Sequence, residues 1–150
     1  MNSINDLYRQ VIMEHYKSPR NKGLKQEDGY VNLSLKNPSC GDDVTVQAKV
    51  ENDIIKSIRH EGTGCSICCS SASVMSEVLK GKTVKEAEAI INDYYNLIKG
   101  EDVQDEESLD EAIAYRGVQN FPARVKCATL AWRCLGAILQ GQKGEQDVEE

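Results

Sequence analysis

The chain has 150 residues, a formal net charge of −6 at pH 7 and an isoelectric point near 5.0, which argues against nucleic acid as its main partner. No apolar run reaches the roughly 18 to 20 residues that span a bilayer, and no basic segment followed by an apolar one begins the chain. With 40% hydrophobic and 28% charged residues, we expect a single cytoplasmic domain over residues 1–150.

The first half of the chain predicts one helix followed by an antiparallel meander. Residues 4–17 carry apolar side chains at helical spacing. Apolar and polar residues then alternate over 31–35 and again over 44–50, which is typical of half-buried strands. A tight turn at 51–53 leads into a third expected strand over 54–58.

The second half of the chain predicts helices. They are expected over residues 65–79, 83–99, 108–116 and 121–140. Capping-box patterns open the second at Thr83 and the third at Ser108, and Pro122 takes the favoured first turn of the last. Residues 101–107 read as an acidic surface loop and 141–150 as a flexible acidic tail. The expected class is α+β, a three-stranded antiparallel sheet with an N-terminal helix and several C-terminal helices packed against it.

Three of the six cysteines stand at predicted element boundaries: Cys40, Cys65 and Cys127. In a reducing compartment such cysteines favour metal binding, redox chemistry or a nucleophilic thiol over disulfides. Cys40 lies in the constrained loop Asn37-Pro38-Ser39-Cys40-Gly41-Asp42, where alternate residues can point the same way. Three thiolates and the Asp42 carboxylate together supply the four ligands of a tetrahedral zinc ion.

The remaining candidate residues have simpler interpretations. Cys68, Cys69 and Cys134 are expected to be packing residues, because unpaired cysteines are often buried, although Cys65-x-x-Cys68 also has the spacing of a ligand pair. His15 and His60 can each serve as a ligand, and the favoured interpretation is a partly exposed polar side chain. A cysteine hydrolase is disfavoured, because neither histidine is recognisably placed as its base.

Two basic residues flank Cys127 in the last expected helix. The positive charge of Arg124 and Lys126 can lower the pKa of that thiol and hold an anionic sulfur species. The alternative is a solvated face of the helix.

Three ordered motifs resemble the U-type iron–sulfur assembly proteins (the IscU/NifU-N superfamily). They are Asn37-Pro38-x-Cys40-Gly41-Asp42, Gly62-x-Gly64-Cys65-x-x-x-x-Ser70-x-Ala72-Ser73 and Arg124-x-Lys126-Cys127-Ala128-Thr129-Leu130. Lys126 before the third cysteine and the acidic segment 101–116 are similar to the SufU branch. Cys68 and Cys69 depart from the family pattern, so Cys68 is either a buried neighbour or a substitute ligand.

The resemblance implies a zinc protein that takes persulfide sulfur from a cysteine desulfurase of the SufS type and passes it towards a SufBCD-type assembly complex. The implied zinc ligands are Cys40, Asp42, Cys65 and Cys127. Cys40 would be the sulfur acceptor, released from zinc when the desulfurase offers a ligand in exchange, and Arg124 and Lys126 would support Cys127 and the docking surface. Two alternatives stay open: a scaffold on which an iron–sulfur cluster is built, and a metal with a purely structural role.

Overall fold

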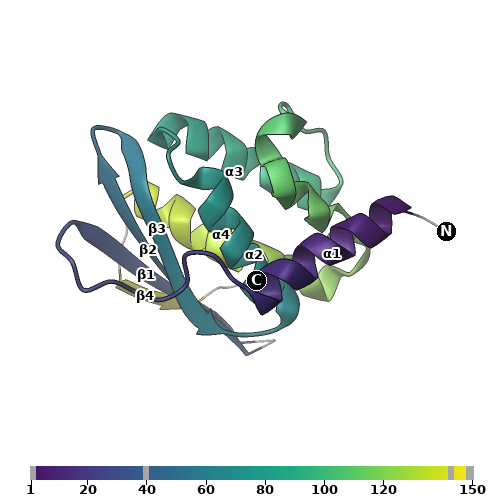
Figure 1. Ribbon diagram of the computed structural model, residues 1–150, viewed down its shortest axis with the longest axis horizontal. Coiled ribbons are helices and arrows are strands. Elements are labelled where there is room, and N and C mark those ends of the chain that lie inside the picture. Colours follow the sequence, from purple (N-terminus) through teal and green to yellow (C-terminus); the bar gives the residue numbers. More distant parts are fainter. Residues whose placement is uncertain (1–2, 39–40, 142–143, 148–150) are drawn as a thin grey trace.

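A computed structural model describes residues 3–38, 41–141 and 144–147, and it confirms the α+β class (Figure 1). The elements in chain order are α1 (Ser3–Lys17), β1 (Tyr30–Asn37), β2 (Asp42–Glu51), β3 (Ile54–Thr63), α2 (Ser66–Leu79), α3 (Val84–Lys99), the 3-10 helix η1 (Glu106–Asn120), α4 (Pro122–Leu139) and β4 (Gly144–Asp147). Helices α2 and α4 lie against the sheet, and α1, α3 and η1 pack on those two helices. None of the described helices is both long and apolar enough to cross a membrane.

The sheet contains the predicted meander and one strand more. Its order is β3-β2-β1-β4, with β1–β2 and β2–β3 antiparallel. Strand β3 continues to Thr63, five residues beyond the predicted end, and so delivers the chain directly to Cys65. Strand β4 pairs in parallel with β1, in the segment expected to be a flexible tail. Edge pairing of this kind depends on backbone groups, which leave no hydrophobic pattern in the sequence.

One of the two predicted capping boxes is confirmed, and the other is wrong. Thr83 Oγ1 accepts from the Glu86 N–H at 3.1 Å, and Glu86 Oε1 accepts from the Thr83 N–H at 2.9 Å. Before η1, however, Asp105 is the cap, accepting from the Ser108 N–H at 3.3 Å and its hydroxyl at 2.6 Å. Ser108 is therefore a donor inside the first turn, and the helical segment begins earlier than predicted and is broken at Asp110, with φ of 50°.

A buried polar contact joins three helices in the centre of the core. The Trp132 and Tyr94 rings stack with centroids 3.9 Å apart. Ser71 Oγ accepts from Trp132 Nε1 at 3.0 Å and donates to the Ala128 carbonyl at 2.6 Å. The Tyr94 hydroxyl donates to the same carbonyl at 2.7 Å. Because α2, α3 and α4 share these hydrogen bonds, directional bonding as well as hydrophobic packing fixes the relative positions of the three helices.

Both histidines are buried, so the expectation of partly exposed side chains is wrong. His15 is fully buried, with Nδ1 2.7 Å from Ser73 Oγ and Nε2 2.8 Å from a Glu111 carboxylate oxygen. This imidazole joins α1 to α2 and η1. His60 Nε2 donates to the Arg20 carbonyl at 2.7 Å and ties the chain after α1 to β3. Both histidines are therefore structural links between distant parts of the chain.

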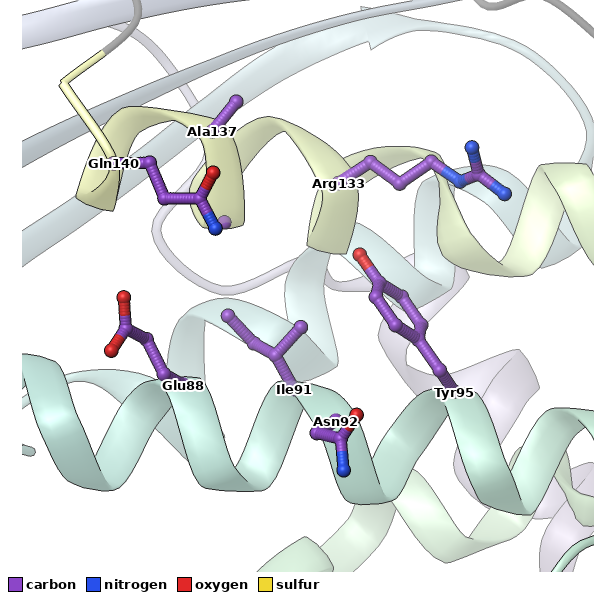
Figure 2. A pocket seen from close by; sticks show the side chains of 8 residues that line it. Glu88, Ile91, Asn92, Tyr95, Arg133, Ala137 and Gln140 are labelled. Carbon is purple, nitrogen blue, oxygen red and sulfur yellow. The ribbon is translucent and has the colours of Figure 1, made fainter.

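A groove of about 660 Å³ separates α3 from α4 (Figure 2). Its lining residues are Glu88, Ile91, Asn92 and Tyr95 from α3 and Arg133, Gly136, Ala137 and Gln140 from α4. They lie towards the C-terminal end of α4, whereas Cys127 lies near its start. The groove is therefore separate from the cysteines that carry the candidate chemistry.

We expect Ser71→Ala to destabilise the fold by about 1–3 kcal/mol, because the variant leaves the buried Trp132 N–H without an acceptor. Urea unfolding followed by the fluorescence of Trp132, the single tryptophan, measures the change. Ser57, which accepts from the Tyr30 hydroxyl at a half-buried position, offers the control Ser57→Ala, expected to lose less. Equal losses in the two variants would contradict a special role for the central contact.

Candidate metal centre

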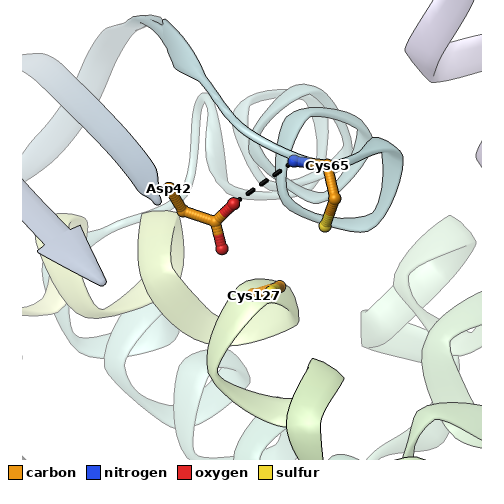
Figure 3. Close-up of side chains that lie close together, drawn as sticks. All are labelled: Asp42, Cys65 and Cys127. Atoms are coloured by element: carbon orange, nitrogen blue, oxygen red, sulfur yellow. Dashed lines mark hydrogen bonds between the residues drawn. The ribbon is translucent and has the colours of Figure 1, made fainter. Parts of the chain in front are cut away.

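Asp42, Cys65 and Cys127, three of the four expected zinc ligands, converge on one point. One ligand atom from each lies within 4.8 Å of the other two, and the side chains face a common space (Figure 3). Asp42 opens β2, Cys65 is the N-cap residue of α2, and Cys127 lies in the second turn of α4. Two thiols and a carboxylate from three separate elements are the donor types that bind zinc.

The Asp42 carboxylate has one hydrogen-bonded oxygen and one free oxygen. The side chain is 1% exposed, and Oδ1 accepts from the Cys65 N–H at 3.2 Å. Oδ2 is buried and has no hydrogen-bond partner. A buried carboxylate oxygen without a partner costs free energy that a bound cation would recover. The donor set therefore fits a metal ion.

Gly64 makes room for this carboxylate. A Cβ atom at position 64 would lie 2.5 Å from Asp42 Oδ1 and 3.3 Å from the Cys68 Cβ. Only glycine lets the chain pass so close to Asp42 between β3 and α2. The Gly62-x-Gly64-Cys65 motif thus has a steric explanation at its second glycine.

The protonation of Cys127 depends on its neighbours. Burial raises the pKa of the Cys127 thiol well above its usual range, and the nearby negative charges of Cys65 and Asp42 raise it further. A cation at the same point would favour the thiolate form of Cys127. The exposed Arg124 supplies part of the positive charge at this point. Its guanidinium pKa is raised by the negative charge of Cys65, by a hydrogen bond to Cys65 and by the nearby Cys127. Lys126, half-buried, directly precedes Cys127 in α4.

Cys40, the expected fourth ligand and sulfur acceptor, lies outside the described residues. The residues on either side of its loop are described. The Asn37 carbonyl accepts from the Gly41 N–H at 2.9 Å, and Gly41 has φ of 76°, a left-handed conformation that glycine adopts readily. Asn37 and Asp42 are register partners across β1 and β2. The loop that contains Cys40 therefore begins and ends beside Asp42.

The other described cysteines are not members of the donor group. Cys68 and Cys134 are fully buried in the hydrophobic core, and Cys134 Sγ is 3.8 Å from the Val44 carbonyl. Cys69 is half-buried. Burial raises the pKa of all three thiols, that of Cys134 to about 12. These positions fit the packing role predicted for Cys68 and Cys134.

The model of the NifU-like N terminal domain matches residues 7–128. The chain belongs to this family. The zinc-dependent sulfurtransferase SufU of Bacillus subtilis is 41% identical to this NifU-like protein over 142 residues, 95% of each chain. The iron–sulfur cluster assembly scaffold protein IscU of Streptococcus pyogenes is 33% identical over 150 residues, 100% of this chain and 93% of IscU.

Solved structures bear out the NifU-like fold. A proposed iron–sulfur cluster assembly scaffold for the SUF system from Fervidobacterium islandicum superposes with a TM-score of 0.78 at 34% identity, covering 87% of this chain and 94% of its own. A hypothetical protein superposes with a TM-score of 0.83, also at 34% identity, over 91% and 98% of the two chains. The resemblance of the three cysteine motifs to the U-type proteins is thereby confirmed.

We expect thiol alkylation of the folded, metal-free protein to separate the cysteines by burial. Cys69, half-buried, should react, whereas Cys68 and Cys134 should stay unmodified until the chain unfolds. Because burial raises the pKa of Cys134 to about 12 and closes its side chain to solvent, it stays almost entirely a thiol at pH 7 to 9 and out of reach of the reagent. Mass spectrometry of peptides after timed alkylation measures each site. Rapid labelling of Cys134 in the native protein would contradict its core position.

Proposed function

We propose that this protein is a zinc-dependent sulfur acceptor and transfer protein of iron–sulfur cluster assembly, which receives persulfide sulfur from a cysteine desulfurase of the SufS type. The observation that carries the proposal is the convergence of two thiols on a buried carboxylate with one free oxygen. The similarity to a relative named zinc-dependent sulfurtransferase over 95% of the chain supports the choice of metal and chemistry. A SufBCD-type assembly complex is the proposed receiver.

In this proposal Asp42, Cys65 and Cys127 hold the zinc ion, and Cys40 supplies the fourth ligand. When bound, zinc keeps the thiols deprotonated and offsets their negative charge. Four anionic donors exceed the charge of the ion, and Arg124 beside Cys65 and Cys127 compensates part of the excess. The carboxylate makes the donor set harder than an all-cysteine site, which is typical of metal sites that exchange a ligand rather than of closed structural ones.

Cys40 is the proposed sulfur acceptor because it stands in the sequence between the end of β1 and the start of β2, whereas Cys127 is buried and Cys65 is the N-cap residue of α2. Its thiolate attacks the terminal sulfur of the persulfide on the desulfurase. A new sulfur–sulfur bond forms at Cys40, the bond within the donor persulfide breaks, and the desulfurase cysteine leaves as a thiolate. The exchange needs no external oxidant or reductant, since one persulfide replaces another.

A groove beside the donor group is the proposed docking surface for the desulfurase. It has a volume of about 800 Å³ and is formed by α1, η1 and the first turns of α2 and α4. Three arginines line the groove, Arg9, Arg116 and Arg124. The exposed Met13 and Phe121 contribute apolar surface to the same lining. On a chain with a net charge of −6, this basic and apolar lining suits a partner surface with acidic and apolar residues.

A scaffold for an iron–sulfur cluster is the second candidate function. The same thiolates can bind iron, and the relative that spans 100% of this chain is named an assembly scaffold. A scaffold must carry a cluster that can be passed on, whereas a sulfur acceptor needs only zinc and the transferable sulfur. Anaerobic reconstitution that yields a stable, transferable cluster would favour the scaffold.

We expect labelled sulfur from cysteine, supplied through a SufS-type desulfurase, to accumulate on Cys40. Cys40→Ala should abolish the label and the stimulation of the desulfurase, while Cys69→Ala, a cysteine outside the donor group, should retain both. Mass spectrometry of the persulfide and the rate of sulfide production are the two measurements. Full stimulation by Cys40→Ala would overturn the role of that thiol.

We expect the zinc content to fall in Asp42→Ala and in Gly64→Ala, the second because a Cβ at position 64 displaces the Asp42 carboxylate. Gly117 has open space around it and provides the control Gly117→Ala, which should retain zinc. Elemental analysis of the purified variants measures the metal. Normal zinc content in Asp42→Ala would exclude this carboxylate as a ligand.

A further inference from the structure

Helices α3 and α4 present matching faces to the groove between them (Figure 2). The lining residues of α3 stand at positions 88, 91, 92 and 95, and those of α4 at positions 133, 136, 137 and 140. Both sets follow the spacing i, i+3, i+4, i+7, so each helix contributes two turns of one face. The faces run antiparallel, with Glu88 opposite Gln140 and Tyr95 opposite Arg133. The groove is therefore two helical turns long, about 10 Å.

The middle of the groove is apolar and open on the α4 side. Ile91 of α3 faces Gly136 and Ala137, which have the two smallest side chains. A glycine inside a helix is less favourable than an alanine, and a Cβ atom at position 136 would lie in open space. Packing within the protein therefore does not require this glycine. The close approach of a backbone from another molecule explains it.

The two ends of the groove carry opposite charges. Glu88 lies at one end and Arg133 at the other. Both side chains are exposed, and neither belongs to an ion pair among the described residues. Burial raises the pKa of Tyr95 to about 12 and the positive charge of Arg133 opposes this rise, so the guanidinium acts on this end of the groove. A complementary occupant offers a negative group near Arg133 and a positive group near Glu88.

The described part of the chain does not supply this occupant. The segment that follows α4 pairs with β1 as β4. None of the described helices carries oppositely charged residues seven positions apart. Two copies of the same concave groove placed face to face would leave its centre empty, which close-packed interfaces avoid. The complementary surface therefore belongs to a different protein.

We propose that the α3–α4 groove is a docking site for one helix of a partner protein. That helix carries an acidic side chain opposite Arg133 and a basic side chain two turns away, opposite Glu88. Apolar residues between them pack on Ile91 and Ala137. Recognition of a helix in a groove uses this same i, i+3, i+4, i+7 spacing, and a contact of only two turns predicts a transient complex.

This docking site is separate from the proposed sulfur chemistry. The α3–α4 groove shares no lining residue with the groove proposed for the desulfurase. The two partners therefore do not compete for the same side chains, and the inference does not depend on the proposed function.

Designed peptides test the inference on the full-length chain. The probe is a stapled helical peptide about four turns long, with Glu and Lys seven positions apart and leucine and alanine between them. One control peptide carries Lys at both positions, and another has a central proline that breaks the helix. Fluorescence anisotropy of the labelled peptides measures affinity, and amide NMR shifts locate the contact. We expect the Glu–Lys peptide to bind along 88–95 and 133–140, the Lys–Lys peptide about 5-fold more weakly, and the proline peptide not to bind.

Reversal of one charge in the protein sharpens the test. In Arg133→Glu both ends of the groove are negative, so this variant should prefer the Lys–Lys peptide over the Glu–Lys peptide. Lys56→Glu makes the same charge change at an exposed position of β3 outside the groove and should keep the wild-type preference. Gly136→Leu fills the centre of the groove and should bind neither peptide, while thermal unfolding followed by Trp132 fluorescence shows that the variant is folded.

Four outcomes would overturn the inference. Two are an unchanged peptide preference in Arg133→Glu and no binding of the Glu–Lys peptide up to millimolar concentration. Equal binding of the proline peptide shows that the occupant is not a helix. Self-association of the wild type that Arg133→Glu abolishes makes the occupant a second copy of this chain. None of these outcomes changes zinc content or sulfur transfer, so the proposed function is judged by its own experiments.

Discussion

The buried carboxylate of Asp42 imposes the constraint on which the site depends. A carboxylate that is 1% exposed must be paired or neutralised, and one N–H from Cys65 satisfies only one of its oxygens. The other oxygen faces two thiols, one of which is itself held protonated by burial. The arrangement is unfavourable without a cation and well matched to one, so the same atoms that destabilise the site make it a candidate metal centre.

The remainder of the fold holds these donors in place. Gly64 lets the chain pass beside the carboxylate, and the bonds among Ser71, Tyr94 and Trp132 fix α2 and α4, which carry Cys65 and Cys127. His15 fastens α1 to α2 and to η1. A donor set on rigid elements keeps its geometry when one ligand leaves, which is what the proposed sulfur transfer requires.

The surroundings of the site differ from the rest of the surface. The chain is acidic overall, yet arginines collect along the groove beside Cys65 and Cys127, together with exposed apolar side chains. Positive charge beside the thiols favours anionic sulfur, and the apolar lining favours a protein partner over a small ion. One region of the molecule thus combines chemical and recognition features, while the α3–α4 groove contains no comparable group of described metal donors.

The sequence by itself determined the elements and most of the donor set. Local patterns predict most elements, because they involve residues only a few positions apart. Examples are the strand alternation, the Thr83 capping box and Pro122 at the start of α4. Three cysteine motifs in the sequence predict Asp42, Cys65 and Cys127 as metal ligands. Tertiary structure alone decided what depends on distant partners: the burial of His15 against residues 58 and 96 positions away, the pairing of β4 with β1, and the unpaired oxygen of Asp42. Burial and hydrogen-bond satisfaction are properties of the packed chain, so no local pattern encodes them.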